Sequence, residues 1–464
     1  MFKKNKGEHY AATWKLLTSP ERLRPSRVKG RSDLDARTEF ENDFDRVVFS
    51  SSFRRLRNKA QVFSLEPHDF VRTRLTHSIE VATIGRSLGE GAAAGMMRKY
   101  PELSMLSPRD IGTIVATACL LHDIGNPPFG HSGEKAIGRW FSNNVDAGIR
   151  LKLPDATERA DLTDFEGNAQ SFRIATRLQW SGQDYGMNLT AATLSTLIKY
   201  PCASNEVQPN GKKTLRKFGY FKADTLAFDL VRSLTRLEEH RRHPLTYLME
   251  AADDIGYATG DIEDVLKKGF VDFGSIHECL STAQSKESKE CVEKFLDEPY
   301  KQDFKKIELR ERQQLSVQRF CQMAIRLMMK SAIAEFLDSF ERIMDGTFED
   351  DLVGKMSMRD LCSALKSIMT KYVYSHIEIA HREQTARNVI AGLLAAIVEE
   401  LQDRPSGALA LSAYRVPPTH EREDEMRVSP NYALSQRAAD YVAGMTDGHA
   451  LAQYQRISGM RSSF

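Results

Sequence analysis

The feature that most constrains this sequence is an apolar helix that ends with an adjacent histidine and aspartate. Residues 110–121 carry apolar side chains at helical spacing, and His122 and Asp123 follow in the last turn, before Pro127 and Pro128 stop the helix. A helix end can direct two consecutive side chains into one cavity, and both groups are ligands of divalent cations. The segment therefore predicts half of a metal site.

A second histidine stands at the start of another helix. Apolar residues recur at helical spacing from Ile79 to Leu88, and His77 precedes them, with Arg72 and Arg74 just before it. Two guanidinium groups beside an imidazole suit a site that holds both a metal ion and phosphate. His77 is therefore a third candidate ligand.

A third segment places polar side chains on one face of an otherwise small and apolar helix. Asp253, Tyr257 and Asp261 are spaced at i, i+4 and i+8. Carboxylates on such a face are costly unless they are paired or ligated. One of the two can therefore complete the metal site.

A single His-Asp pair is weak evidence in a chain with 12 histidines, so the surrounding sequence has to decide. The set His77, His122, Asp123 and Asp253 resembles the H…HD…D pattern of the HD-domain phosphohydrolases. Within that superfamily, five segments in order resemble the deoxynucleoside triphosphate triphosphohydrolases, the bacterial dGTPase group. These segments are RTRLTHS, LLHDIGNPPFGHSGE, FEGNAQ, LIKYP and EAADDIGYATGDIED.

The resemblance covers most of residues 30–265 and returns weakly near residues 444–447. It implies an all-α fold, an HD-domain helical bundle with additional C-terminal helices. It also implies a dNTP as substrate and a homo-oligomer as the active form, with a hexamer expected.

Composition fits a soluble, globular protein. Apolar residues make up 41% and charged residues 28% of the chain, and the formal net charge is only +2, so the overall charge does not demand nucleic acid. The six cysteines form no Cys-x-x-Cys pair, and the N-terminus has no apolar run behind its basic residues. We therefore expect a cytoplasmic protein that neither enters a membrane nor contains a zinc finger.

Three parts are expected along the chain. They are a polar N-terminal arm (1–40) that folds onto the body or a neighbouring subunit, an HD core (41–283), and a C-terminal helical region (284–464) that completes the site and the oligomer contacts. Strand-like alternation is scarce, which also favours an all-α fold. Helices are expected at 77–99, 109–124, 132–142, 166–179, 190–199, 223–242, 244–258 and 431–447.

Two imidazoles and two carboxylates suit an octahedral cation. The set is too rich in oxygen for structural zinc and too small for a saturated calcium cage, which leaves Mn²⁺, Mg²⁺ or Fe²⁺ with positions open to water and substrate. Mn²⁺ and Mg²⁺ are expected first, with Fe²⁺, Co²⁺ and Ni²⁺ as the other candidates. One such ion can polarise a phosphoryl oxygen and hold a water for in-line attack.

His131 and Glu134 are spaced at i, i+3 on the first turn of the next helix. A carboxylate that hydrogen-bonds an imidazole fixes its tautomer and raises its basicity, so the pair suits proton transfer. The resemblance implies the same catalytic role. The alternative is the ordinary use of His-x-x-Glu to cap a helix start.

A triphosphate needs more positive charge than one divalent ion supplies. Arg74, Asn168, Lys199 and Tyr200 are the candidate phosphate contacts, because they stand in the motifs where the resemblance implies such contacts. Each is weak alone, and Lys199 equally suits the negative end of a helix dipole.

The resemblance also implies contacts to the sugar and base. Asp261 takes the 3′-hydroxyl, and Tyr257 packs where a ribose 2′-hydroxyl would have to fit. Gln61, in the match Lys-Ala-Gln-Val-Phe, contacts the sugar with Val62 beside it. Arg437 is expected to reach the base or sugar, either within its own chain or from a neighbouring subunit. The alternative for Tyr257 is an aromatic residue of the core.

The expected function is thus metal-dependent hydrolysis of a dNTP at the α-phosphate, which gives a deoxynucleoside and tripolyphosphate. A second enzyme hypothesis keeps the metal site and changes the substrate to a cyclic nucleotide, an alarmone or a nucleoside monophosphate.

A third hypothesis is a nucleotide-sensing protein that binds single-stranded DNA. It rests on the segment 212–221, where four basic residues stand next to three aromatic ones and could grip a single strand. A solvated loop that is held down by its aromatic residues is an equally good explanation of the same pattern.

Overall fold

The computed structural model describes residues 2–24, 35–65, 70–145, 151–179, 186–296, 307–374, 376–403 and 427–460. Within these ranges the secondary structure is helical and no sheet forms; two isolated β-bridges join Arg22 to Thr190 and Ala60 to Thr73. The predicted all-α class is confirmed. In the same ranges, no helix has the length and apolar composition needed to cross a bilayer.

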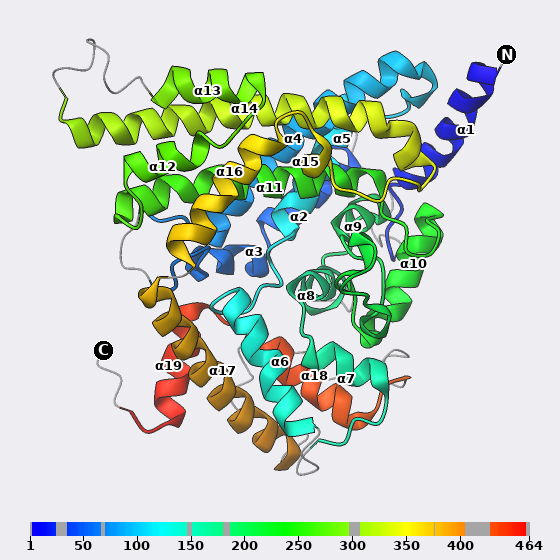
Figure 1. The fold of residues 1–464 in the computed structure, drawn as a ribbon. Coiled ribbons are helices and arrows are strands. Elements are labelled where there is room, and N and C mark those ends of the chain that lie inside the picture. Colours follow the sequence, from blue (N-terminus) through cyan, green and yellow to red (C-terminus); the bar gives the residue numbers. More distant parts are fainter. Residues whose placement is uncertain are drawn as a thin grey trace.

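Figure 1 shows the helices in chain order. The α-helices are α1 (Phe2–Leu17), α2 (Glu39–Val48), α3 (Ser51–Arg55), α4 (Arg74–Lys99), α5 (Pro108–Leu121), α6 (His131–Val145), α7 (Ala156–Thr163), α8 (Gly167–Arg173), α9 (Ala191–Leu197), α10 (Thr225–Thr235), α11 (Pro244–Lys268), α12 (Phe273–Leu280), α13 (Lys286–Leu296), α14 (Leu309–Met344), α15 (Leu352–Lys355), α16 (Arg359–Ile368), α17 (Ile377–Asp403), α18 (Pro430–Ala443) and α19 (Asp447–Ile457). Short 3-10 turns occur at Leu56–Asn58, Pro101–Leu103, Ser204–Glu206, Lys213–Leu215 and Lys222–Asp224, and π-helical turns occur at Ile174–Leu178 and Met369–Val373.

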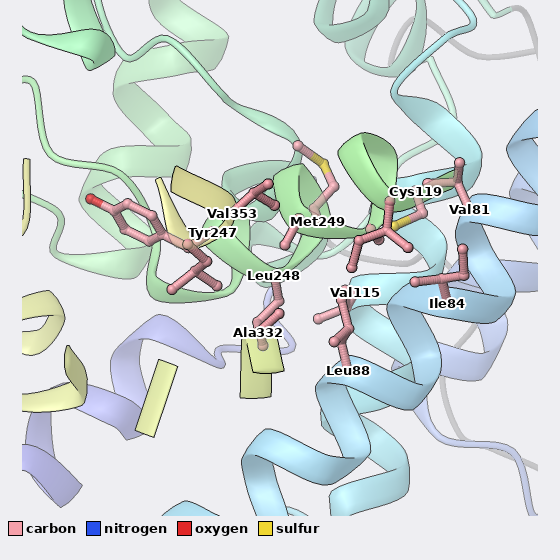
Figure 2. Close-up of a cluster of buried hydrophobic side chains, with 14 of the residues drawn as sticks. Val81, Ile84, Leu88, Val115, Cys119, Tyr247, Leu248, Met249, Ala332 and Val353 are labelled. Carbon is pink, nitrogen blue, oxygen red and sulfur yellow. The ribbon is translucent and has the colours of Figure 1, made fainter. Parts of the chain in front are cut away.

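The helices α4, α5 and α11 form the centre of the larger hydrophobic core, and α14 crosses them (Figures 1 and 2). Glycine lets α4 and α5 approach closely, because a Cβ on Gly89 would lie 2.8 Å from the Cα of Gly112. Leu88, Val115 and Leu248 fill the space between these helices and are fully buried. Such packing keeps the ends of the three helices in a fixed relation.

A second hydrophobic core is formed mainly by α6, α7, α17 and α18, in the lower part of Figure 1. The loop after α5 passes from one core to the other, since Ile124 belongs to the first and Phe129 to the second. The first core contains residues from Tyr10 to Val373 and so includes side chains on both sides of residue 284. The division into an HD core (41–283) and a C-terminal region (284–464) therefore stays a prediction.

The predicted N-terminal arm contains α1, which packs on the body of its own chain. Tyr10 and Trp14 are buried in the first core, and the Tyr10 hydroxyl donates to Asp345 at 3.2 Å. Lys6 pairs with Glu341 at 2.9 Å. Residues 25–34 of the arm lie outside the described part of the chain.

Several helices end elsewhere than predicted, each for a local reason. α10 stops at Thr235 because Arg236 adopts the left-handed conformation (φ 53°), and α11 continues to Lys268, where Gly269 (φ 77°) ends it. The predicted helix 431–447 is two helices, because Thr446 caps a new one by accepting from the His449 N–H.

Candidate metal centre

Three of the predicted ligands converge at the ends of two central helices. His77 lies in the first turn of α4, and His122 and Asp123 follow the last turn of α5. One ligand atom from each residue lies within 4.8 Å of the others, and all three side chains are largely buried. This spacing is suited to a single metal ion.

The backbone fixes which nitrogen His122 presents. Its Nδ1 lies 2.6 Å from the carbonyl oxygen of Cys119, so Nδ1 donates to that oxygen and Nε2 is the nitrogen that faces the cluster. Nε2 is buried and has no hydrogen-bond partner in the described part of the chain. A buried, unpartnered nitrogen that faces a carboxylate and another imidazole fits a metal ligand.

Asp253 brings the fourth predicted ligand from α11. Its Oδ1 lies 3.3 Å from Nε2 of His77 and 3.4 Å from Nε2 of His122. About a third of its side chain (32%) remains exposed, so the cluster is open on this side. The four residues thus face one another from three helices.

The electrostatics of the cluster favour positive charge at its centre. Burial opposes charge on His122, but Asp123 and Asp253 raise its pKa to about 9. Burial likewise opposes charge on Asp253, yet His122 and His77 hold its pKa well below the ordinary value. The two carboxylates therefore favour a cation beside the two imidazoles, and a divalent metal ion is one that this set of ligands can bind.

Arg74 and Asn126 hold Asp123 from both sides. Nη1 of Arg74 donates to Oδ2 of Asp123 at 2.8 Å, and the Asn126 amide donates to Oδ1. Arg74 was expected to contact phosphate, and the structure places its guanidinium on a candidate metal ligand. Its Nε has no partner among the residues that the structure describes. Sequence reasoning missed Asn126, although it follows Asp123 by three residues in the same motif.

His131 and Glu134 form the predicted pair at the start of α6. Nδ1 of His131 lies 2.9 Å from Oε2 of Glu134, and Oε1 of Glu134 accepts from the Gly167 N–H at 2.9 Å. The imidazole is 67% exposed, whereas the carboxylate is buried. Because the carboxylate bonds an imidazole and another helix, this arrangement differs from the helix-capping alternative.

Gly167 lies between the metal cluster and this pair. A Cβ at residue 167 would come within 2.5 Å of Oε1 of Glu134 and 3.1 Å of Oδ1 of Asn126. Asn168 follows it at the start of α8, where its amide donates to Glu166, the N-cap of that helix. The structure thus places Asn168 beside the His131–Glu134 pair.

Lys199 and Tyr200 lie beside the N-terminal half of α11. Lys199 pairs with Glu250 at 3.2 Å, and Glu250 also accepts from Arg242 at 2.8 Å. Both cations lie 5.8 Å from the centre of the Tyr200 ring. Glu250 precedes Asp253 by one turn, so this cationic group lies next to the cluster, and Lys199 is held there by an ion pair.

Two predicted sugar contacts have buried polar atoms without a partner. Oδ2 of Asp261 and Oε1 of Gln61 are both buried and lack a hydrogen bond within the described residues. Burial raises the pKa of Asp261 to about 7. Val62 packs against the first core, and Tyr257 is half-buried on α11 between the two aspartates.

Arg437 is not brought to the metal centre by any contact that the described residues make. It lies half-buried in α18, next to Gln436. Gln436 donates to Asp440, which also pairs with Arg173. Within one chain, Arg437 therefore stays a prediction.

The basic segment 212–221 is folded down onto the protein. Phe218 and Phe221 are buried in the second core. Lys213 pairs with Asp351, and Lys217 pairs with Glu166 at 2.6 Å. The geometry favours the explanation in which the aromatic residues anchor a solvated loop, since neither ring is available to stack on a base.

Comparison with known proteins gives consistent results along most of the chain. An HD domain model matches residues 74–157, and a phosphohydrolase-associated domain model matches residues 353–456. A deoxyguanosinetriphosphate triphosphohydrolase-like protein of Listeria monocytogenes is 36% identical over 475 residues, which cover 96% of this chain and 99% of that protein.

Two further relatives show the same extent of similarity. A protein of the same name from Synechocystis sp. is 34% identical over 469 residues (96% of this chain and 99% of that protein). The deoxyguanosinetriphosphate triphosphohydrolase of Serratia proteamaculans is 28% identical over 494 residues (93% and 95%). Similarity therefore extends over nearly the full length of each relative.

Proposed function

The chain belongs to the deoxyguanosinetriphosphate triphosphohydrolase-like family and is a hydrolase of the HD superfamily, and from this membership we propose that it hydrolyses a dNTP at the α-phosphate. The products are a deoxynucleoside and inorganic tripolyphosphate. The observation that carries the proposal is that α11 bears Asp253 in the metal cluster and, two turns on, Asp261, whose buried Oδ2 has no donor within the described ranges. One nucleotide can reach both places, with a phosphate bound at the metal cluster and a sugar hydroxyl that donates to Asp261.

His77, His122, Asp123 and Asp253 hold one divalent metal ion, Mn²⁺ or Mg²⁺ in the first place and Fe²⁺, Co²⁺ or Ni²⁺ as alternatives. When bound, the ion polarises the α-phosphoryl oxygen and lowers the pKa of water near it. The unsatisfied Nε2 of His122 supports this assignment. Arg74 and Asn126 fix the orientation of Asp123, which limits the geometries available to the site.

His131 handles the proton, with Glu134 as its partner. The bond at 2.9 Å between Nδ1 of His131 and Glu134 fixes the tautomer and leaves Nε2 free to exchange a proton with substrate or water. The exposure of the imidazole supports the assignment, since a substrate can reach it.

The triphosphate lies between the metal cluster and the surrounding cations. Lys199 and Tyr200 contact it from the side of Glu250, Asn168 contacts it from the start of α8, and Arg74 contributes N–H groups that Asp123 does not use. The ion pair of Lys199 with Glu250 keeps the pKa of Lys199 raised despite its burial, so the side chain carries its charge at neutral pH.

The nucleoside lies along α11. Asp261 accepts the 3′-hydroxyl, Gln61 with Val62 contacts the sugar, and Tyr257 occupies the space that a 2′-hydroxyl would need. Arg437 contacts the base or sugar, from a neighbouring copy in a homo-oligomer that we propose to be a hexamer. We place the enzyme in the cytoplasm.

One experiment tests the function directly. The purified protein is incubated with each dNTP and each NTP in Mn²⁺ or Mg²⁺, and nucleoside, tripolyphosphate and pyrophosphate are resolved. We expect tripolyphosphate from at least one dNTP and none from the Asp253→Asn variant. Hydrolysis of a cyclic nucleotide, alarmone or monophosphate in place of every dNTP would assign the site to another substrate, and inactivity on all of them would remove the catalytic account.

A further inference from the structure

Asp447, at the first position of α19, connects two segments that are far from it in sequence. Its Oδ1 accepts from the Phe129 N–H at 3.0 Å, and its Oδ2 accepts from the Ala60 N–H at 3.2 Å. The side chain is buried, which penalises its charge. Burying a carboxylate costs free energy, and here the carboxylate bonds two backbone N–H groups. We take this as a sign that the position of the loop is important for the site.

The loop that Asp447 holds has an unusual backbone. Phe129 (φ 64°) and Gly130 (φ 58°) are consecutive residues in the left-handed region, which a bulky side chain such as Phe rarely enters. Immediately afterwards α6 begins at His131. The direction of this turn therefore decides the position of the His131 side chain. The bond from the Phe129 N–H to Asp447 stabilises the left-handed conformation of the turn.

Lys59 holds the other end of the same loop. Its buried ammonium donates to the carbonyl oxygens of Asn126 and Ala443, the latter at 2.8 Å. Burial, with Arg55 nearby, lowers the pKa of Lys59 to about 7. Ala443 is the last residue of α18, so Lys59 links the loop to the same C-terminal segment that carries Asp447.

The segment that contains Lys59 and Ala60 is itself fixed to the metal-binding helix. The Lys59 carbonyl accepts from the Arg74 N–H at 3.0 Å, and Ala60 forms a β-bridge with Thr73. Gln61 comes next in the chain. Two parts of the site thus meet at the Asp447 carboxylate, the segment before Gln61 and the loop before His131, and the first of these also bonds the start of α4.

We propose that Asp447 is a positioning residue for the reaction: it fixes the loop that carries His131 relative to the segment that carries Gln61. It touches neither the four ligands nor the His131–Glu134 pair and acts only through the two backbone N–H groups. The inference rests on the proposed function, because it treats His131 and Gln61 as groups that meet the substrate. It also gives the C-terminal region a defined task in a site whose ligands come from α4, α5 and α11.

The test compares Asp447→Asn with the wild type and with Ser429→Ala. Asparagine keeps the volume but can accept at only one of the two positions. Ser429→Ala removes the N-cap of α18, in the same C-terminal segment, without touching the loop. For Asp447→Asn we expect kcat to fall by about 10- to 100-fold, with a changed pH profile of kcat. Mn²⁺ affinity should stay within about twofold, because the ligand cluster is intact. For Ser429→Ala we expect a lower melting temperature and unchanged kcat.

Amide hydrogen exchange supplies a readout that does not need activity. Asp447→Asn should speed exchange in peptides that cover residues 126–131 and 59–61, and Ser429→Ala should not. An active wild type with kcat, KM and pH profile unaltered in Asp447→Asn would overturn the positioning role while leaving the proposed function intact. A wild type that hydrolyses no dNTP would overturn the proposed function. In that case unaltered exchange in both peptides would overturn the structural basis of the inference as well.

Discussion

Nη1 of Arg74 donates to Oδ2 of Asp123 at 2.8 Å, and both side chains are buried. The pair joins the first residue of α4 to the residue that follows His122 at the end of α5. Because Arg74 and Asn126 occupy different oxygens of the carboxylate, Asp123 can present only a restricted set of lone pairs to an ion. The metal-binding strength of the site should therefore depend on a residue that is not a ligand.

Arg74→Gln should weaken binding of the metal ion. The neutral amide loses the charge-assisted bond to Asp123, and loss of such a partner typically costs about 10- to 100-fold in metal affinity. Titration with Mn²⁺ measures the effect, and Arg86→Gln, an exposed arginine of the same helix, is the control. Unchanged Mn²⁺ affinity together with a raised KM for the dNTP would mean that Arg74 serves the phosphates and not the ligand.

Glu134→Gln should reduce kcat and leave Mn²⁺ affinity unchanged. A glutamine oxygen can still accept from the Gly167 N–H, but its amide group cannot accept from Nδ1 of His131, so the tautomer is no longer fixed. Loss of a positioned acid or base typically costs about 10²- to 10⁴-fold. Steady-state kinetics at saturating metal measures it, with Lys135→Gln on the exposed side of the same turn as the control. A kcat within twofold of the wild type, itself about the scatter of such measurements, would exclude the pair from proton transfer.

The four candidate metal ligands could be singled out from the sequence because each has a local sequence context. His77, His122 and Asp123 lie at helix ends that can be located from apolar periodicity and proline. Asp253 shares one face of a helix with Asp261. These features need no knowledge of which helices touch. The all-α fold followed from the same periodicity.

The residues that sequence reasoning missed act across long separations. Asp447 and Phe129 are 318 positions apart, and no pattern within the chain joins them. Glu250 was missed because its role depends on Lys199 and Arg242, which come from outside its helix. Such contacts depend on tertiary packing, which spacing along one segment does not encode.

The segment 212–221 shows the same limit in reverse. Basic residues stand next to aromatic ones there, which suits a single strand of nucleic acid as well as a loop. Only the packing shows that Phe218 and Phe221 point inward. The pairing of Lys213 with Asp351 likewise joins residues that are 138 positions apart.

Asp161 should make the protein less stable as the pH rises. It is fully buried, and burial raises its pKa to about 7, although Tyr432 donates to it. A folded-state pKa above the unfolded value means that the folded state binds the proton more tightly, so this contribution is present below about pH 4 and is lost as the pH rises through about 7.

Asp161→Asn should therefore flatten the pH dependence of stability. The amide oxygen can accept from the Tyr432 hydroxyl and the Lys222 N–H, which both use Oδ2 in the wild type. The free energy of unfolding of Asp161→Asn minus that of the wild type should be about 1 to 3 kcal/mol larger at pH 8 than at pH 5. Urea unfolding at both pH values measures this. Asp164→Asn, exposed and one turn away, should show no such change, and parallel pH dependences for wild type and Asp161→Asn would contradict the prediction.

Gly167→Ala should damage the site more than the fold. Its Cβ would lie 2.5 Å from Oε1 of Glu134, which already accepts from the Gly167 N–H, and 3.1 Å from Oδ1 of Asn126. Because Glu134 is held by His131 and Asn126 by Asp123, neither side chain can move aside without releasing its partner. We expect kcat to fall by about 10- to 100-fold, since small displacements of reacting groups have effects of that size.

The matched control is Gly448→Ala, a helical glycine of α19 with nothing within 4 Å of its added Cβ. It should keep full activity and be at least as stable as the wild type, because alanine favours a helix over glycine. Thermal unfolding and steady-state kinetics on both variants separate the two effects. If Gly167→Ala and Gly448→Ala had the same kcat, the contact between Gly167 and Glu134 would have no bearing on proton transfer, and the His131–Glu134 pair would act independently of α8.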